Sequence, residues 1–302
     1  MFSESPQIWV LCGPTGIGKT DFSIDLALKL EAEIICLDAF QVYRDIPILS
    51  ACPTQEEYSA AVHHLYEIIE PDNNFSVAEY YDLATNKIMD CWRRGVTPLL
   101  VGGTGLYLKV LSDGFQQSGF DQNLKLREQL QTLAQKEGRS AVYEILVQKN
   151  PDRAAELHPN DLKRVIRSIE IADHSGTPEQ TRNDLKRFCP IWRKVCLMEE
   201  REILYNGVNA RVEQMISRGV EAEVEGLLRR NIKSDFTICQ AIGFPETRDY
   251  IDGLISKVEW IERFQRNTRR FLKRQLTWYR SMKDLEIVWQ NQRQECLESL
   301  IK

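Results

Sequence analysis

Apolar and polar residues along the first hundred positions follow a pattern that predicts strands separated by helices. Short apolar runs at residues 8–12, 33–38 and 97–103 have the length of buried strands and are bounded by turn residues. An amphipathic pattern covers residues 19–30, and a second helix is predicted to begin after Ser76, which forms a capping box with Glu79, and to end at Gly95. Strands that alternate with helices predict an α/β fold with a parallel sheet and crossover helices.

The pattern changes after about residue 122, where only helical periodicity remains. Successive helical segments follow one another up to Gly176. An apolar run at residues 191–198 then predicts a return to the sheet, and the rest of the chain is predicted to be helical. We therefore expect an α/β core that is interrupted by an all-helical segment.

Composition sets the class of protein. The chain has 302 residues, of which 43% are hydrophobic, so it can bury the core of one large domain or of a core plus an insertion. It begins without a signal-peptide pattern and has no apolar run near the roughly 20 residues that span a membrane. We expect a soluble, cytoplasmic protein without a membrane partner. The eight cysteines lack zinc-site spacing and are expected to be reduced and mostly buried.

The distribution of charge changes the meaning of the net charge of −5, which alone would disfavour a nucleic-acid partner. Residues 263–283 contain eight basic residues and no acidic one. On a helix, every basic residue except Lys283 falls on one arc. The opposite arc carries Phe264, Phe271, Leu272, Trp278, Tyr279 and Met282. An unbroken basic stripe is typical of a surface that binds phosphates, so we favour a nucleic-acid partner over a simple solvated helix.

The segment between the first strand and the first helix has the spacing of a phosphate-binding loop. Gly13, Gly18, Lys19 and Thr20 fit the pattern G-x-x-x-x-G-K-T, in the strand-to-helix context that makes the motif specific. The backbone N–H groups of such a loop and the positive end of the helix bind a diphosphate. The lysine adds a point charge, and the Thr20 hydroxyl can bind Mg²⁺. The motif does not identify whose phosphate it holds.

The ends of the predicted strands differ from those of an ordinary P-loop nucleotidase. Such an enzyme carries a carboxylate after a later apolar strand, whereas here that strand ends in Gly102, Gly103 and Thr104. The nearest strand-end acid is Asp38, which we expect in the ligand crevice as a base or as the partner of a metal-bound water. The glycines would let the backbone approach a ligand closely, with Thr104 as a hydroxyl donor.

Several short strings carry a resemblance to a known family. They are GPTGIGKT, DAFQVYR, VHHL, FSVAEY, LLVGGTGLYLK, LHPNDLKRVIRSIEI, QAIGF and NTRRFLKRQLTWYR. In this order and at similar intervals they resemble the tRNA dimethylallyltransferases, over nearly the whole chain. GGTGLY and KRQLTW are the most specific, because simple P-loop kinases lack them. The resemblance implies a P-loop core with C-terminal basic helices at residues 1–117 and 188–302, and an inserted helical domain at residues 118–187 that binds the anticodon stem.

The resemblance also implies an activity. It is the transfer of the dimethylallyl group from dimethylallyl diphosphate to N6 of the adenosine 3′ of the anticodon, in tRNAs that read codons beginning with U, with release of diphosphate. The implied partners are the tRNA anticodon stem-loop and dimethylallyl diphosphate, and the implied cofactor is Mg²⁺. We expect the chain to act as a monomer.

The resemblance also implies roles for individual residues, at the positions that match the motifs of the family. The resemblance implies Asp38 as the general base, Thr104 as the hydroxyl that positions the reacting base, and Arg127 as a catalytic cation near the diphosphate. The residues implied to bind the diphosphate are Gly13, Pro14, Thr15, Gly16, Ile17, Gly18, Lys19, Thr20 and Arg211, with Thr20 as the Mg²⁺ ligand. The residues implied to contact tRNA are Asp38, Ala39, Phe40, Gln41, Lys163, Arg164, Arg167, Gln240, Gly243, Phe244, Lys273, Arg274, Gln275, Trp278 and Arg280.

Some positions depart from the family pattern. Ala39 stands where the family usually has serine, and DIPILSACP at residues 45–53 replaces a glycine, an acid, a threonine and a lysine of the usual segment. Phe244 and Pro245 stand where a tyrosine and a basic residue are usual. Because the phosphate loop, Asp38 and the KRQLTW string are intact, we expect an active member with altered affinity or acceptor choice, the alternative being a decayed paralogue.

Three other activities stay open at this stage. A P-loop small-molecule or nucleoside kinase would use Asp38 to deprotonate a hydroxyl acceptor and would consume ATP, but it leaves the basic helix unexplained. A non-catalytic RNA-binding protein would leave Lys19 and Asp38 without a role. An isopentenyltransferase acting on free nucleotides shares the prenyl chemistry, and the long C-terminal half of the chain argues against it.

Overall fold

The structure, a computed structural model, describes residues 5–117, 123–174, 180–230, 232, 236–282 and 284–299. They form two compact units, Met1–Asp113 with Asn183–Lys302, and Gly114–Arg182. The smaller unit begins and ends earlier than the predicted insertion at 118–187, because two short strands that sequence reasoning missed, β5 (Phe115–Gln117) and β6 (Gln180–Arg182), pair antiparallel within it. Residues 118–122 and the predicted helix end at Gly176 lie outside the described residues.

A six-stranded parallel sheet forms the base of the larger unit. Its strands are β1 (Gln7–Cys12), β2 (Ala32–Cys36), β3 (His63–His64), β4 (Thr97–Gly102), β7 (Ile191–Met198) and β8 (Glu286–Trp289). They lie in the order β3-β2-β4-β1-β7-β8, and every pair is parallel. The α/β fold class and the four longer strands are confirmed. The two edge strands were not predicted, and β8 corrects the expectation that the last part of the chain is wholly helical.

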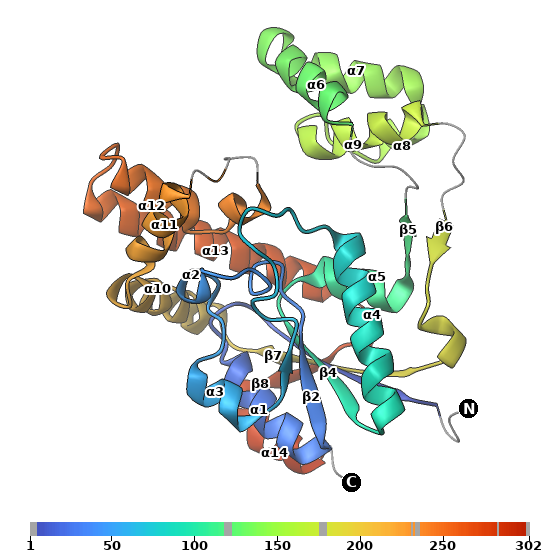
Figure 1. Cartoon of the computed structure of the whole chain (residues 1–302), viewed down its shortest axis with the longest axis vertical. Helices are drawn as coiled ribbons and strands as arrows, with labels where there is room; N and C mark the ends of the chain where they lie inside the picture. The colour runs from blue at the N-terminus through green and yellow to red at the C-terminus, as the bar shows by residue number, and fades with distance from the viewer. Residues whose placement is uncertain are drawn as a thin grey trace. The chain divides into compact units, whose positions relative to one another are not determined.

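Helices connect the strands of the larger unit. They are α1 (Lys19–Leu30), α2 (Pro47–Ser50), α3 (Gln55–Ala60), α4 (Val77–Arg94), α5 (Gly105–Asp113), α10 (Arg201–Ser217), α11 (Val220–Arg229), α12 (Phe244–Ile251), α13 (Lys257–Ser281) and α14 (Arg293–Ser299), with 3₁₀ turns η1 (Lys186–Phe188), η2 (Thr237–Gln240) and η3 (Gln290–Gln292). The chain moves outward from β1 to β2 through α1, and inward from the edge strand β3 to β4 through α4. Right-handed crossovers in opposite directions place α1 and α4 on opposite faces of the sheet, as Figure 1 shows.

The predicted limits of α4 are confirmed in detail. The Ser76 side chain accepts a hydrogen bond from the Glu79 N–H at 3.2 Å, and the Glu79 carboxylate accepts one from the Ser76 N–H at 2.8 Å. Gly95 ends the helix in the left-handed conformation. Both free ends of the helix are therefore satisfied by residues that the sequence alone identifies.

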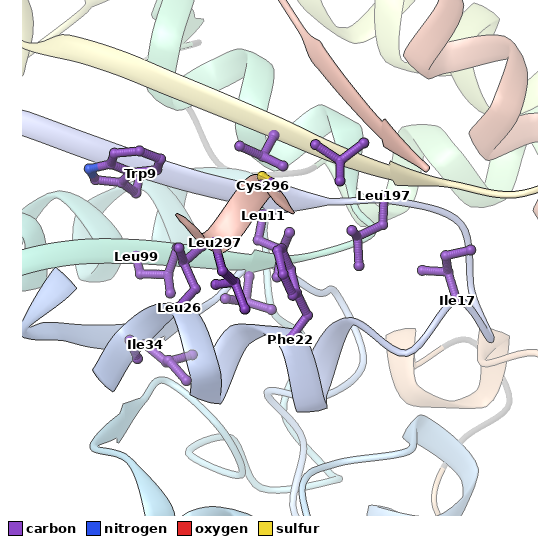
Figure 2. Packing of buried hydrophobic residues seen from close by; sticks show 14 of the residues in the cluster. Trp9, Leu11, Ile17, Phe22, Leu26, Ile34, Leu99, Leu197, Cys296 and Leu297 are labelled. Carbon is purple, nitrogen blue, oxygen red and sulfur yellow. The ribbon is translucent and has the colours of Figure 1, made fainter. Parts of the chain in front are cut away.

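The core of the larger unit explains why its central strands are continuously apolar. β1 and β4 are covered on both faces, so nearly all of their side chains are buried instead of alternating with exposed ones. Figure 2 shows Leu11 and Leu99 of these strands packed with Phe22 of α1 and Leu297 of α14. Ile17, from the loop after β1, joins the same cluster and anchors that loop in the core.

The smaller unit has its own core. Its helices are α6 (Leu124–Glu137), α7 (Arg139–Lys149), α8 (Pro151–Ala155) and α9 (Leu162–Asp173). They bury a cluster that contains Leu130, Val142, Leu146, Ala154, Leu157, Val165, Ile166 and Ile169. A separate cluster of this kind is what a compact inserted unit requires.

Two expectations about composition can be compared with the structure. Within the described part of the chain, no helix is both long enough and apolar enough to cross a bilayer. All eight cysteines are free thiols, and all but Cys189 are buried, which confirms the prediction of reduced, mostly buried thiols.

Candidate functional site

A cavity of about 380 Å³ lies at the carboxyl ends of the central strands. The loops that follow β1, β2 and β4 line it together with α10 and α13. This is the edge at which open α/β sheets bind ligands. Among the residues singled out in the sequence, the cavity brings together Thr15, Gly16, Gly18, Lys19, Thr20, Asp38, Ala39, Phe40, Gln41, Thr104, Arg211, Arg274, Gln275 and Trp278.

The loop between β1 and α1 is shaped to receive an anion. Gly16 and Gly18 have φ angles of 81° and 79°, which residues with a β-carbon rarely adopt, so the backbone requires glycine at both positions. Gly18 caps α1 without a side-chain hydrogen bond, which leaves the N–H groups of the first turn to a ligand. The Lys19 ammonium group donates to the carbonyls of Gly13 and Pro14, each at 3.0 Å, and is thus held at the loop.

Two cations in the cavity, Lys19 and Arg211, form no ion pair within the part of the chain that the structure describes. The pKa of Lys19 is lowered to about 8, first by burial and then by the positive charge of Arg211. Burial also lowers the pKa of Arg211, which has no hydrogen bond or ion pair with any described residue. Buried cations are normally paired with carboxylates. Their arrangement beside the diphosphate loop therefore favours an anionic ligand.

Asp38, which follows β2, is the carboxylate of the cavity. Its Oδ1 accepts hydrogen bonds from the N–H groups of Phe40 at 2.9 Å and Gln41 at 3.4 Å, while Oδ2 has no partner among the described residues. Burial raises the pKa of Asp38, and the two N–H groups together with Lys19 and Arg211 oppose that rise. One oxygen thus fixes the side chain and the other is left to accept a proton.

Thr104 joins the ends of β2 and β4. Its Oγ1 accepts a hydrogen bond from the Ala39 N–H at 3.1 Å, and its own N–H donates to the Leu37 carbonyl at 3.1 Å. The hydroxyl hydrogen is left to donate to a ligand. Ala39 also lines the cavity, so the serine hydroxyl that it lacks would lie close to Asp38.

The basic helix, α13, contributes more to the cavity than its periodicity predicts. Phe271 and Trp278, which the sequence places on the packing face, are only partly buried and line the cavity. The Arg274 guanidinium lies 5.6 Å from the centre of the Phe271 ring and has no ion pair with a described residue. The expectation of two separate arcs is therefore corrected, because one edge of α13 faces neither the core nor solvent but the cavity.

Sequence reasoning missed an apolar wall. Its residues, contributed by α2, α10 and α13 and by the turn before α12, are Leu49, Val212, Met215, Ile242 and Phe264. Leu49 belongs to the segment that departs from the family pattern. The partly buried Glu223 carboxylate holds that segment by accepting hydrogen bonds from the N–H groups of Ile48 at 2.7 Å and Leu49 at 2.9 Å. No sequence signal identifies Glu223 as the partner of this turn.

Other predicted residues of the larger unit lie outside the cavity. Gly13 and Pro14 contribute loop carbonyls, and the Ile17 side chain points into the core (Figure 2). The structure exposes Gln240, Lys273 and Arg280, whereas it buries Gly243 and Phe244. Lys283 lies outside the described residues. Contact of these residues with tRNA stays a prediction.

The remaining predicted residues belong to the helical unit. Arg127 donates two hydrogen bonds of 2.7 Å to the carboxylate of Glu170, to which Arg167 also donates at 3.1 Å. Lys163 and Arg164 are exposed on α9, and Arg164 pairs with Asp161. A role for Arg127 at the diphosphate, and for the α9 residues on tRNA, stays a prediction.

Comparison with known proteins places the chain in a family. The sequence model described as IPP transferase matches residues 41–282. The tRNA dimethylallyltransferase of Halothermothrix orenii is 39% identical over 96% of this chain and 89% of its own length, and that of Bacillus subtilis is 38% identical over 96% and 92%.

Solved structures agree with the sequence comparison. The tRNA isopentenylpyrophosphate transferase from Bacillus halodurans matches with a TM-score of 0.71 at 35% identity, covering 97% of this chain and 95% of that one. A eukaryotic dimethylallyltransferase acting on tRNA matches with a TM-score of 0.76 at 27% identity, covering 94% and 74%. The chain therefore belongs to the IPP transferase family.

Proposed function

We propose that this protein transfers the dimethylallyl group of dimethylallyl diphosphate to N6 of the adenosine 3′ of the anticodon, in tRNAs that read codons beginning with U, and releases diphosphate. One observation carries the proposal: a single cavity joins a diphosphate loop, two cations that form no ion pair with a described residue, and a strand-end carboxylate, Asp38. Membership of the IPP transferase family supports prenyl transfer to tRNA over the kinase, the RNA-binding protein and the free-nucleotide enzyme.

In the proposed reaction, the protein neutralises the leaving diphosphate and positions the attacking amine. The N6 nitrogen forms a bond to C1 of the allyl group, while the bond from C1 to oxygen breaks and its electron pair leaves with the diphosphate. An allylic cation is stabilised by its own π system, so the protein mainly neutralises the leaving group and positions the amine. In this proposal, Lys19, Arg211 and the N–H groups at the start of α1 neutralise the leaving group, and their common position at the cavity supports that role.

Asp38 is suited to receive the proton of the amine. An exocyclic amine becomes acidic only as its nitrogen bonds to carbon, so its base must lie beside it at that moment. The fixed Oδ1 and the unpartnered Oδ2 provide that geometry, and burial makes the carboxylate a stronger base than one in water. Thr104, tied to the Ala39 N–H, can donate its hydroxyl hydrogen to the adenine ring.

The apolar wall suits the prenyl group. Leu49, Met215 and Phe264 give the five-carbon chain a surface with little water. Exclusion of water protects an allylic cation from hydrolysis.

Thr20 is the residue that would hold Mg²⁺. Its side chain lines the cavity at the start of α1 and makes no hydrogen bond with a described residue. Mg²⁺ usually takes one or two protein oxygens and completes its shell with water and substrate phosphate oxygens, so a single hydroxyl beside a diphosphate loop fits the ion. A bound Mg²⁺ would neutralise charge on the diphosphate.

The outer edge of α13 is proposed to hold the tRNA backbone. Arg266, Arg270, Lys273 and Arg280 are exposed along it. Such contacts position the RNA without reading its sequence. The target adenine must leave its stack to enter the cavity, which costs a few kcal/mol and costs least in a single-stranded loop. We further propose that the helical unit binds the anticodon stem and that the protein acts as a cytoplasmic monomer.

Transfer of labelled prenyl group tests the proposal. Radiolabelled dimethylallyl diphosphate, Mg²⁺ and an unmodified tRNA that reads codons beginning with U are incubated with the wild type, with Asp38→Asn and with Asp252→Asn. Asp38→Asn keeps an oxygen for the N–H groups of Phe40 and Gln41 but cannot accept the proton. Loss of a general base typically lowers the rate by about 10²- to 10⁴-fold.

The control separates the base from a general loss of charge. Asp252 is exposed after α12, so Asp252→Asn is expected to label tRNA at the wild-type rate. Nucleoside analysis should place the label on the adenosine 3′ of the anticodon. A folded wild type that labels no tRNA, but consumes ATP with a small hydroxyl acceptor, would refute prenyl transfer in favour of the kinase.

A further inference from the structure

The two most specific strings of the sequence contact one another. A β-carbon at Gly103 would collide with Gln275 Nε2, and one at Gly105 would collide with the Trp278 indole. GGTGLY and KRQLTW are 172 positions apart at Gly103 and Gln275. Gly103 and Gly105 thus make room for side chains of the second string, and α13 approaches the end of β4 directly.

Gln275 uses both ends of its side-chain amide. Its Oε1 accepts a hydrogen bond from the Thr15 N–H at 2.9 Å, and its Nε2 donates to the Gly103 carbonyl at 3.1 Å. The residue is 5% exposed, so neither bond competes strongly with water. Gln275 therefore links the diphosphate loop after β1 to the loop after β4. It also occupies the Thr15 N–H, which sequence reasoning assigned to the diphosphate.

Tyr279 lies one helical turn further along α13 and holds the same two loops. Its hydroxyl donates to the Gly13 carbonyl at 3.0 Å and approaches the Gly103 carbonyl at 3.4 Å. The Gly13 carbonyl also accepts from the Lys19 ammonium group at 3.0 Å. A diphosphate that draws Lys19 away removes one of two donors from this carbonyl, and Tyr279 remains as the other.

The link continues to the proposed base. Gly103 is followed by Thr104, whose Oγ1 accepts from the Ala39 N–H next to Asp38. The path from the diphosphate loop to the carboxylate thus runs through Gln275 and one short loop. The relative position of leaving group and base is set along this path.

We propose that Gln275 and Tyr279 are positioning residues of the prenyl-transfer site. They hold the diphosphate loop at a fixed place relative to Thr104 and Asp38, and Tyr279 keeps the Gly13 carbonyl paired when the diphosphate recruits Lys19. The inference rests on the proposed function for the identity of the donor. Neither residue touches the reacting atoms.

Tyr279→Phe, which removes only the hydroxyl, tests the second half of the proposal. Its matched control is Tyr250→Phe on α12, where the ring stacks on Trp260 and the hydroxyl makes no hydrogen bond with a described residue. Calorimetric titration with inorganic diphosphate is expected to give a Kd about 3- to 10-fold higher for Tyr279→Phe, since a neutral hydrogen bond contributes about 0.5–1.5 kcal/mol. KM for dimethylallyl diphosphate should rise by the same factor. KM for tRNA should not change, and Tyr250→Phe should match the wild type.

Gln275→Glu tests the first half. The carboxylate can still accept from the Thr15 N–H but cannot donate to Gly103, and it adds a negative charge next to the diphosphate loop. We expect a higher Kd for diphosphate and a lower kcat, with KM for tRNA close to that of the wild type. Tm should fall, because the new carboxylate stands at a position that is only 5% exposed. A purely structural role would instead raise both KM values together.

The outcomes separate this inference from the proposed function. Wild-type diphosphate affinity and kinetics in folded Tyr279→Phe and Gln275→Glu would overturn the inference while prenyl transfer by the wild type still stood. A wild type that binds diphosphate but labels no tRNA would refute the proposed function, and the calorimetric comparison would still decide whether these side chains position the loop.

Discussion

The helical unit and the cavity differ in how their partly buried cations are paired. In the helical unit, Arg127 and Arg167 both donate to Glu170, whose side chain is 0% exposed. In the cavity, Lys19 and Arg211 form no ion pair with a carboxylate in the described part of the chain. Burial by itself would raise the pKa of Glu170, yet the two arginines lower it, whereas burial lowers the pKa of both cavity cations.

We infer from this difference that the paired cations serve the fold and that the cavity cations serve a ligand. A buried charge that is paired and hydrogen-bonded can be tolerated within the fold, whereas an unpaired one costs stability. The fold retains Lys19 and Arg211 despite that cost, next to the start of α1, which has no side-chain cap. We infer that their partner is the diphosphate of the substrate.

The largest effect should follow from breaking the paired cluster. Arg127→Ala leaves the buried Glu170 carboxylate with Arg167 and the Asn123 N–H but without its bidentate partner, so we expect the helical unit to lose up to about 3 kcal/mol of stability. Hydrogen exchange of amides in α6 to α9 measures this loss within the full chain. Arg164→Ala, at an exposed pair with Asp161, should change it by less than about 0.5 kcal/mol. A fall in transfer rate at unchanged stability would contradict this view and support the role that the resemblance implies for Arg127.

Removing one of the cavity cations should weaken binding of the donor without lowering stability. Lys19→Met and Arg211→Met should each weaken binding of dimethylallyl diphosphate by about 10- to 100-fold, because hydrogen bonds to charged groups contribute about 1.5–3 kcal/mol. Thermal unfolding should show an equal or higher Tm, since each substitution removes a desolvated charge. A clear loss of Tm with unchanged donor affinity would show that these cations serve the fold.

The pH dependence of donor binding should distinguish the cavity cations from the paired cations of the helical unit. The pKa of Lys19 is lowered to about 8, so the ammonium group is present below that pH and is lost as pH rises through it. Affinity for dimethylallyl diphosphate should therefore fall above about pH 8, and this limb should vanish in Lys19→Met. On the acid side, the raised pKa of Asp38 means that transfer should decline at a higher pH than for an ordinary carboxylate.

The Glu170 cluster should respond to pH in its own range. Because the pKa of Glu170 is lowered in the folded state, its contribution to stability is present above the ordinary carboxylate pKa and is lost as pH falls through the folded value. The helical unit should therefore weaken only in acid. The alkaline limb of donor binding should leave its hydrogen exchange unchanged.

The smallest effect concerns the exposed cations of α13. Lys273→Ala should weaken tRNA binding modestly and reduce the slope of log K against log salt by about 1, since one phosphate contact is lost. Donor affinity should not change. An unaltered salt slope would place the tRNA backbone elsewhere on the protein.

Much of the fold could be predicted from sequence because local signals and burial agree there. The apolar runs of β1, β2, β4 and β7 and the capping box at Ser76 are local patterns that tertiary contacts support. β8 was missed because only Val288 of its four residues is buried, which hides its strand character. β5 and β6 escaped because three-residue strands carry no periodicity.

The parts of the site that belong to a sequence motif could be predicted. The parts that depend on how distant segments pack in the folded chain could not. The diphosphate loop and Asp38 were found through spacing and position at strand ends. The double role of Gln275 depends on two loops that meet only in the folded chain. Periodicity likewise assigned Phe271 and Trp278 to the core, because a helical arc cannot distinguish a core from a cavity lined by the same helix.

Comparing the affinities for dimethylallyl diphosphate and for ATP tests most directly whether Lys19 and Arg211 bind a prenyl diphosphate. Each compound would be titrated with Mg²⁺ into the wild type and into Lys19→Met, and affinity would be measured by calorimetry. We predict that the wild type binds dimethylallyl diphosphate more tightly than ATP and that Lys19→Met weakens this binding while Tm is retained. Tighter binding of ATP together with its hydrolysis, and no binding of dimethylallyl diphosphate, would contradict the account.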